Sequence, residues 1–181
     1  SDEERAQISE LVEPLIKELR DHDIKVKYDD ADNKKPGWKF SEYEMKGVPV
    51  RLALGPRDVE EGTIEVMRRD TLEKETVPYE GIGKRVEELL DQIQENLYQR
   101  ALDFRTEHTY SCDDWDDFCE KVEAGGFVMA HWDGTAETEA RIKELTKATI
   151  RCIPLGQPDE PGKDILTGKP SERRVLFACS Y

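Results

Sequence analysis

Long apolar runs are absent from the 181-residue sequence, and this absence excludes a membrane-spanning class of protein. No stretch reaches the roughly 18 consecutive apolar residues that a transmembrane helix needs, although hydrophobic residues make up 36% of the chain. The first ten residues, SDEERAQISE, are acidic and lack the apolar segment of a secretory signal peptide. We therefore expect a soluble, cytoplasmic protein with a buried core and no membrane partner.

An excess of positive charge is also missing, because 27 Lys and Arg stand against 41 Asp and Glu, a formal net charge of −14. This balance argues against a generic nucleic-acid coat and against DNA as a partner, since phosphate binding needs a local surplus of Lys and Arg. One stretch has such a surplus: residues 34–57 contain six basic residues against Glu42 and Glu44. On charge alone, a solvated surface and a phosphate-binding face both remain open.

Cysteine is scarce, and the spacing of the four that are present argues against a disulfide framework. If Cys112 and Cys119 both lie on a helix, a rise of about 1.5 Å per residue separates them by roughly 10 Å, which is too far for a disulfide. Cys152 and Cys179 stand in apolar strand-like runs, where we expect small buried hydrophobic side chains. We interpret all four as reduced structural residues.

The hydrophobic pattern of the first third of the chain predicts an α/β domain. Apolar residues at helical spacing over 4–20 predict an amphipathic helix, and the alternation of Ile24, Val26 and Tyr28 predicts a half-buried strand straight after it. A helix that leads directly into a strand is the second half of a β-α-β unit. We therefore expect a first strand before Ser1, and a chain that is part of something longer.

The rest of the chain predicts two further groups of elements. Those of the first domain are a short helix at 38–46, strands within GVPVRLALG and GTIEVMRRD, and a long helix over 79–108. Those of the second are helices at 113–123 and 136–146 and strands at 127–132, 150–155 and 174–181. We place an α/β domain at 1–107, with 80–107 as a connector helix, and a small α+β domain at 108–181. The loop 156–170 needs either a metal or good turn chemistry to stay ordered.

Residues 36–70, PGWKFSEYEMKGVPVRLALGPRDVEEGTIEVMRRD, resemble the anticodon-binding domain of class II prolyl-tRNA synthetases of the archaeal and eukaryotic type. The similarity continues through TKATIRCIPLG and GKPSERRVLFACSY to the C-terminal tyrosine. It implies an α/β anticodon-binding domain, a mixed sheet flanked by helices whose first strand is missing here, followed by a small zinc-binding-like α+β domain.

The same resemblance implies a function for the whole enzyme and a limited part of it for this chain. The enzyme would be a homodimer that attaches proline to tRNA-Pro with ATP and Mg, through a catalytic core that precedes these domains. We expect no catalytic residue and no cofactor in this chain, whose partners would be tRNA-Pro and its own catalytic domain.

The resemblance also assigns RNA-binding roles. Glu44 and Arg51 match the family's guanine readers, because a carboxylate can accept from the N–H edge of guanine and a guanidinium can grip its O6/N7 edge. Arg57 and Asp58, in GPRD, match contacts to the adjacent guanine, and Phe40 is placed to stack on an unstacked base. The alternative for Glu44 and Arg51 is a surface salt bridge of about 0–1 kcal/mol.

Two further basic residues, Arg68 and Arg69 in RRD, allow two interpretations. They either bind RNA phosphate or pair structurally with Asp70 or neighbouring acids. The sequence does not decide between these two roles.

The small domain resembles a zinc domain that has lost its ligands. Zinc-bearing relatives have the patterns W-C-G-x-x-x-C and C-x-x-C-G-K-P, and here the four cysteine positions hold Asp133, Thr138, Asp164 and Thr167. Threonine hydroxyls are poor zinc ligands, so we expect no metal and hydrogen bonds in its place.

The last residue, Tyr181, follows an apolar strand, and in the family this terminus resembles a strut that docks toward the catalytic domain. The alternative is a tyrosine that only closes the core of the small domain. For the whole chain, a stand-alone RNA- or protein-binding module with the same fold is the alternative function. A thiol or hydrolytic enzyme using Cys119 or Cys152 with His108 or His131 has no supporting motif.

Overall fold

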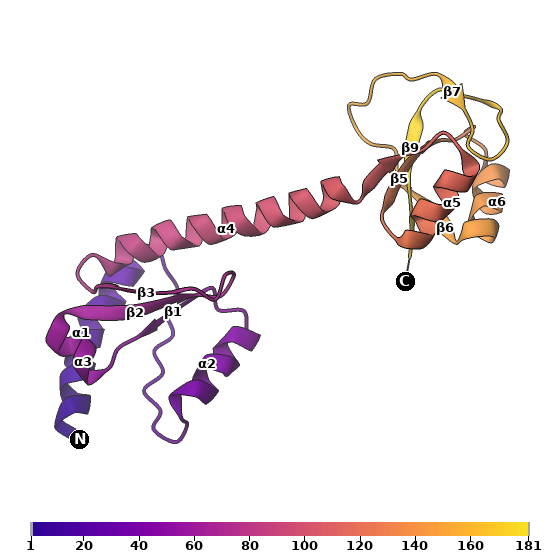
Figure 1. Cartoon of the computed structure of the whole chain (residues 1–181). Helices are drawn as coiled ribbons and strands as arrows, with labels where there is room; N and C mark the ends of the chain where they lie inside the picture. Colours follow the sequence, from indigo (N-terminus) through magenta and orange to yellow (C-terminus); the bar gives the residue numbers. More distant parts are fainter. Residues whose placement is uncertain (1, 181) are drawn as a thin grey trace. The chain divides into compact units, whose positions relative to one another are not determined.

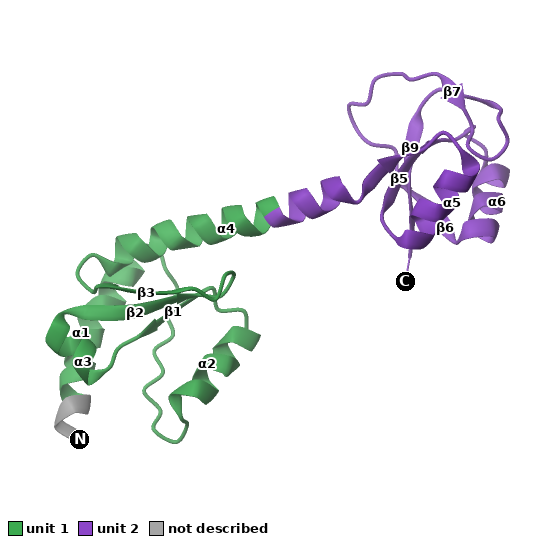
Figure 2. Ribbon diagram, viewed as in Figure 1, with its two compact units in different colours: residues 1–99 green, residues 100–181 purple. Residues whose placement is uncertain are grey.

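The structure, a computed structural model, describes residues 2–180 and divides into two compact units, residues 1–99 and 100–181 (Figure 2). The division falls within one long helix, α4 (Ile82–Glu107). Tyr181, and with it the proposed docking role, lies outside the described residues. In the part of the chain that the structure describes, no helix is long and apolar enough to cross a membrane.

Unit 1 contains a three-stranded sheet and helices on both of its faces (Figure 1). Its elements, besides the start of α4, are α1 (Asp2–Asp21), α2 (Pro36–Met45), β1 (Val50–Ala53), α3 (Pro56–Glu61), β2 (Thr63–Arg68) and β3 (Lys74–Pro78). The strand order is β1-β2-β3, and both pairings are antiparallel. The helices at 4–20, 38–46 and 79–108 and the strands in GVPVRLALG and GTIEVMRRD are therefore confirmed.

The core of unit 1 lies on one face of this sheet. Leu15 and Leu19 of α1 pack there with Ile64 and Val66 of β2 and with the buried side of α4. Because side chains alternate along a strand, Glu65 and Met67 point to the opposite face, the one that α2 covers. The two faces therefore differ: the α1 face packs into the core, and the α2 face carries polar side chains.

The prediction of a strand at 24–28 is wrong. These residues belong to no helix and to no sheet. Ile24 and Val26 do pack against the core, as their alternation predicts. The period-2 pattern reports which side chains are buried, whereas a strand also needs a hydrogen-bonded neighbour, and the described part of the chain gives this segment none.

Three short elements in the part of the chain before residue 112 were not predicted. Helix α3 has six residues and ends at Gly62, whose φ of 70° is the left-handed conformation that favours glycine at a helix end. Strand β3, KETVP, has a single strongly apolar residue, Val77, that packs on the core. Strand β4 (Thr109–Ser111) has three residues. Periodicity needs longer runs than these to be visible.

Unit 2 is an α+β unit built on a four-stranded sheet. Besides β4 its elements are α5 (Trp115–Ala124), β5 (Phe127–His131), α6 (Ala136–Thr146), β6 (Ala148–Cys152), β7 (Gly162–Lys163), β8 (Pro170–Ser171) and β9 (Arg174–Cys179). The strand order is β4-β5-β9-β6, parallel only between β4 and β5. Phe118 of α5 meets Phe177 of β9 edge to face at 5.2 Å in its core.

The four cysteines are free thiols, but two of them are not where the sequence indicates. Cys112 is buried, and burial raises its pKa to about 12. Cys152 and Cys179 are exposed rather than buried. Both stand at the last position of a strand, and the β6–β9 register shifts next to Cys152, so the apolar run around each no longer faces the core there.

Candidate functional site

A small hollow lies on the α2 face of unit 1, which we call the α2 notch. It is lined by Phe40, Tyr43, Glu44, Val48, Arg51, Met67 and Arg69. Phe40 and Glu44 are four residues apart on α2 and therefore share one side of that helix. The register of β1 and β2 pairs Arg51 with Met67, which places both on the same face of the sheet.

Arg51 lies at the centre of the α2 notch and is only 15% exposed. Its guanidinium carbon stands 3.6 Å from the centre of the Phe40 ring, a cation–π contact that fixes the plane of the guanidinium. Its Nη2 donates to Glu65 Oε1 at 3.2 Å. Its Nε is buried and has no hydrogen-bond partner among the described residues. A buried unpaired N–H is costly, and Arg51 carries this cost within the α2 notch.

Glu44 is held less tightly than Arg51. Its Oε1 is 3.9 Å from Arg51 Nη1, at the outer limit of an ion pair, and its side chain is 41% exposed. The closer carboxylate partner of Arg51 is Glu65, which Lys74 also contacts at 3.2 Å. A tight Glu44–Arg51 salt bridge is therefore not what occupies the α2 notch, and the Glu44 carboxylate keeps open acceptor positions.

Arg69 joins α2 to the sheet. Its Nε donates to the backbone oxygen of Glu44 at 2.8 Å, and its own N–H donates to Pro49 O at 2.9 Å. The side chain is otherwise exposed. It therefore holds the end of α2 in place while its remaining N–H groups face outward.

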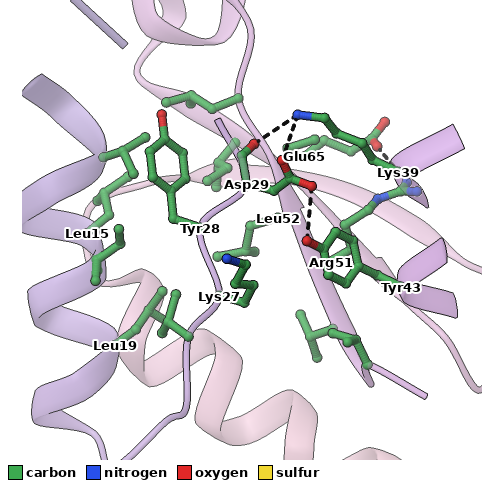
Figure 3. Close-up of a pocket in the computed structure, with 18 of the residues that line it drawn as sticks. Leu15, Leu19, Lys27, Tyr28, Asp29, Lys39, Tyr43, Arg51, Leu52 and Glu65 are labelled. Carbon is green, nitrogen blue, oxygen red and sulfur yellow. Dashed lines mark hydrogen bonds and ion pairs between the residues drawn. The ribbon is translucent and has the colours of Figure 1, made fainter. Parts of the chain in front are cut away.

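A second anchor of α2 was missed by sequence reasoning. Lys39 Nζ lies 2.9 Å from Asp29 Oδ1, and Tyr43 Oη donates to Asp29 Oδ2 at 3.0 Å (Figure 3). The Lys39 contact is the main reason that the pKa of Asp29 lies below its usual value. Nothing in the run YDD marks Asp29 as the partner, because its contact crosses ten residues of loop and helix.

Arg57 and Asp58 lie on α3, outside the α2 notch. Arg57 is 84% exposed and pairs with Glu61 Oε1 at 2.8 Å one turn away. Asp58 Oδ2 accepts from the backbone N–H of Gly55 at 2.7 Å, which caps the start of α3. The structure therefore brings Phe40, Glu44, Arg51 and Arg69 together and leaves Arg57 and Asp58 on a neighbouring element.

Arg68 is on the opposite face from the α2 notch and is engaged there. Its Nε and Nη2 donate to the two carboxylate oxygens of Asp70 at 3.1 and 2.7 Å, and its Nη1 donates to Gln92 of α4. Asn96 of α4 donates to the same carboxylate at 2.7 Å. Asp70 is 1% exposed at its side chain. This arrangement links β2 to α4. Of the two roles considered for Arg68, it corresponds to the structural pairing with Asp70.

We expect Asp70→Asn to lower the free energy of unfolding of unit 1 at neutral pH by roughly 2 kcal/mol. The hydrogen bond from Arg68 is the main cause that lowers the pKa of Asp70 from 3.8 to about 2. Because this folded-state pKa lies below the unfolded one, the stabilisation is present above about pH 4 and is lost as the pH falls through about 2. Urea denaturation at several pH values checks this.

The exposed Asp91→Asn variant on α4 is the matched control and should match the parent chain at every pH. A destabilisation by Asp70→Asn that stays constant down to pH 2 would show that the loss comes from packing rather than from the charge.

An exposed aromatic residue on α2 was also missed. Trp38, in the first turn of α2, is 51% exposed, and Lys34 Nζ lies 4.6 Å from the centre of its ring. A tryptophan within the basic stretch 34–57 is a signal that sequence reasoning could have used, since aromatic faces beside cations suit stacking of unpaired bases.

The positions that match zinc ligands form two hydrogen-bonded turns in unit 2. Asp133 Oδ1 accepts from the N–H and hydroxyl of Thr135 at 3.0 and 2.8 Å, and its Oδ2 accepts from the hydroxyl of Thr138 at 2.9 Å. Asp164 Oδ1 accepts from the N–H groups of Leu166 and Thr167 and from the Thr167 hydroxyl, at 2.7–3.0 Å.

One further bond joins the two turns: the N–H of Asp133 donates to Asp164 Oδ2 at 3.0 Å. Asp164 is 3% exposed, and its carboxylate is saturated with donors. The structure therefore shows the turn chemistry that the sequence predicts for these four residues. In residues 2–180, no group of three or more His, Cys, Asp or Glu is arranged to hold a metal ion.

We expect the purified chain to contain no stoichiometric zinc and to keep its denaturation midpoint in excess EDTA, because both carboxylates already accept hydrogen bonds from their own turns. Elemental analysis and denaturation with and without chelator check this. About one zinc per chain, or unfolding on chelation, would contradict it.

The histidines do not form a thiol site. His108 Nδ1 contacts Phe104 O at 2.7 Å, and buried His131 Nδ1 lies 3.1 Å from the Ser171 hydroxyl, which itself donates to Arg173 O. Burial raises the pKa of Cys119, which disfavours a reactive thiolate. The arrangement of these groups fits core polar contacts.

Comparison with known proteins supports the division into two parts. Residues 2–89 match the family described as anticodon binding domain, and residues 115–181 match the family described as prolyl-tRNA synthetase, C-terminal. The chain is similar over its full length to curated proteins named proline–tRNA ligase: 60% identical to that of Porphyromonas gingivalis strain ATCC 33277 and 58% identical to that of Phocaeicola vulgatus. It spans 37% of the length of each of these relatives.

Proposed function

Because the chain belongs to the prolyl-tRNA synthetase family, as its anticodon-binding C-terminal region, we propose that it recognises the anticodon of tRNA-Pro within an enzyme that joins proline to this tRNA. The observation that supports this proposal is the α2 notch, where an oriented guanidinium, a loosely held carboxylate and an aromatic ring meet on one face.

The chemistry of the α2 notch suits guanine. Glu44 accepts from the Watson–Crick N–H groups of the base, which its exposed oxygens can reach. Arg51 is the donor that matches the O6 and N7 edge of guanine. Phe40 holds the Arg51 guanidinium on one side of its ring and offers the uncovered part to a base.

The neighbouring residues take supporting roles in this proposal. Arg57 extends into solvent from α3, whose start the Asp58 carboxylate caps, so the pair can contact the adjacent guanine. Arg69 positions α2 and can meet a phosphate with its outward N–H groups. Arg68 acts only through Asp70, because both of its strong donors are already used there.

The remaining activities belong to the whole enzyme, and we propose them for it. ATP and Mg would be bound by the catalytic core, which would also be the partner of the C-terminal Tyr181. A cytoplasmic homodimer fits this role. The contribution that we propose for this chain is recognition of the anticodon.

The test of the proposed function is to measure the binding of tRNA-Pro transcripts to the full-length enzyme. The transcripts have either the parent sequence or one anticodon guanine at a time replaced by adenine. We expect each replacement to weaken binding by about 10-fold or more, since one mismatched base contact costs roughly 1–3 kcal/mol. Equal affinity for all transcripts would overturn the proposal.

We expect Glu44→Gln to reduce this discrimination at one anticodon guanine, because the amide replaces one acceptor oxygen with a donor. The ratio of affinities between parent and substituted transcripts should fall about 10-fold in the variant. Glu42→Gln, at a neighbouring exposed position paired with Lys46, is the control and should keep the parent ratio. An unchanged ratio for Glu44→Gln would leave Glu44 as a surface acid only.

A further inference from the structure

Helix α2 carries two residues of the proposed guanine site, Phe40 and Glu44, yet it adds no buried residue to the core of unit 1. Met45, at its end, is 87% exposed. The helix has ten residues, and an isolated helix shorter than about 12 residues is marginal in water. The position of α2 therefore depends on a few side-chain contacts rather than on apolar burial.

Several of these contacts converge on Asp29, which lies between α1 and α2 (Figure 3). Lys39 Nζ lies 2.9 Å from Asp29 Oδ1 and donates to the Asp29 backbone oxygen at 3.2 Å. Tyr43 Oη donates to Asp29 Oδ2 at 3.0 Å, and the N–H of Ala31 donates to Oδ1 at 3.1 Å. The side chains of Lys39 and Asp29 are only 15% and 22% exposed, so solvent screens their ion pair less than a surface pair.

The spacing along α2 links this cluster to the guanine site. Lys39 and Tyr43 are one helical turn apart, as are Phe40 and Glu44, and the two pairs are offset by one residue. One residue corresponds to a rotation of about 100° around the axis of an α-helix. When Asp29 holds Lys39 and Tyr43, it therefore fixes the rotation of α2 and the direction in which Phe40 and Glu44 point.

The contacts on Asp29 differ from the other contacts of α2 in one respect. The contact of Phe40 with Arg51, and that of Arg69 with the backbone oxygen of Glu44, involve groups that the proposed function assigns to the RNA. Asp29 is not among the residues that line the α2 notch. Its contacts can therefore persist while a base occupies the α2 notch.

From this arrangement we propose that Asp29 is a positioning residue for anticodon recognition, which holds Phe40 and Glu44 in the orientation that receives a guanine. The proposal rests on the proposed function of the α2 notch and adds a residue that does not itself touch the RNA. The hydrogen bond from Lys39 lowers the pKa of Asp29 below its usual value. The carboxylate is therefore charged at neutral pH, and the ion pair with Lys39 is complete there.

The test is Asp29→Ala in the full-length enzyme. We expect KM for tRNA-Pro to rise about 10-fold and kcat for charging to stay at the parent value, because one well-placed base contact is lost. The preference for the parent transcript over one with a replaced anticodon guanine should fall about 10-fold as well. Asp30→Ala removes the same charge from the exposed neighbouring position, and this control should keep the parent KM and preference.

Two further measurements separate positioning from a general loss of structure. ATP–pyrophosphate exchange by Asp29→Ala should equal that of the parent, since a folding defect would lower it together with charging. In the 181-residue chain, we expect Asp29→Ala to speed amide exchange at 40–46 about 10-fold or more and to leave β2 unchanged, because α2 adds no buried residue to the core.

The double variant Lys39→Met, Tyr43→Phe removes the same contacts from the side of α2. Since Asp29 acts through these two residues, adding Asp29→Ala to the double variant should change KM by less than about 2-fold. If Asp29→Ala does not fold, the double variant gives the same readouts.

Fully additive effects would overturn the proposal, and so would equal acceleration of exchange in α2 and β2. A parent enzyme that prefers its guanines and an Asp29→Ala variant that keeps this preference would overturn the positioning role alone. A parent enzyme without any preference would instead refute the proposed function, and the positioning role with it.

Discussion

Arg51→Ala is expected to lower kcat/KM for aminoacylation of tRNA-Pro by the full-length enzyme about 10- to 100-fold, while leaving proline activation unchanged. The loss of a bidentate guanine contact costs roughly 1–3 kcal/mol. The side chain has no role in the chemistry of activation if its place is the α2 notch. Charging of tRNA-Pro and ATP–pyrophosphate exchange, measured side by side, separate the two steps.

Two further variants sharpen this experiment. Arg51→Lys keeps the charge but not the planar fork, and we expect nearly the same loss as for alanine. Arg20→Ala removes a positive charge from an exposed position of α1, and this variant should charge tRNA-Pro at the parent rate. An equal drop in pyrophosphate exchange for Arg51→Ala would contradict the anticodon role and indicate a folding defect instead.

Asp164→Ala is expected to destabilise unit 2 by about 3–5 kcal/mol, the largest effect on stability that we expect in the chain. The substitution removes the acceptor of three backbone N–H groups, those of Asp133, Leu166 and Thr167, and of one hydroxyl. Without the carboxylate these donors have no partner. Asp164 is only 3% exposed, so water reaches the site poorly and does not replace the lost acceptor.

The measurement is hydrogen exchange of β5 and β9 in increasing denaturant, which reports on unit 2 alone. Asp164→Asn keeps one acceptor oxygen, so we expect it to lower the stability of unit 2 less than Asp164→Ala does. Asp159 is an exposed acid of the same loop, and Asp159→Ala should leave the stability of unit 2 unchanged. A stability of Asp164→Ala within about 1 kcal/mol of the parent would show that the two turns are held by packing and not by the carboxylate.

The sequence predicts most of the long elements of this fold because their periods are unambiguous. The helices α1 and α4 and the strands β2 and β9 all have stripes or runs of apolar residues that face a core. The error at 24–28 has a different origin: alternation of side chains was read correctly, but pairing depends on a neighbour that local sequence does not describe. The exposed Cys152 and Cys179 show the same limit, because the end of a strand can leave the core while the run continues.

The candidate site could be predicted only in part, for a related reason. Phe40, Glu44 and Arg51 were assigned by the family resemblance, and helical spacing and strand alternation account for their meeting on one face. The partner of Arg51, Glu65, depends on the register between two strands, which sequence does not specify. Arg68 and Arg69 are adjacent and look alike, yet the alternation of β2 sends one to Asp70 and the other to α2.

The turns of unit 2 that are held by carboxylates have other requirements for folding than a zinc–thiolate site has. A thiolate site depends on zinc availability and is lost when its sulfurs are oxidised. Asp133 and Asp164 require neither a metal nor a reducing environment, because their partners are Thr135, Thr138 and Thr167 of the same turns. The stability of these turns depends on pH instead. Burial raises the pKa of Asp133, but the hydrogen bonds from Thr135 and Thr138, together with the charge of Lys169, outweigh it and hold that pKa below its usual value. This turn is therefore secure at neutral pH and weakens only in acid.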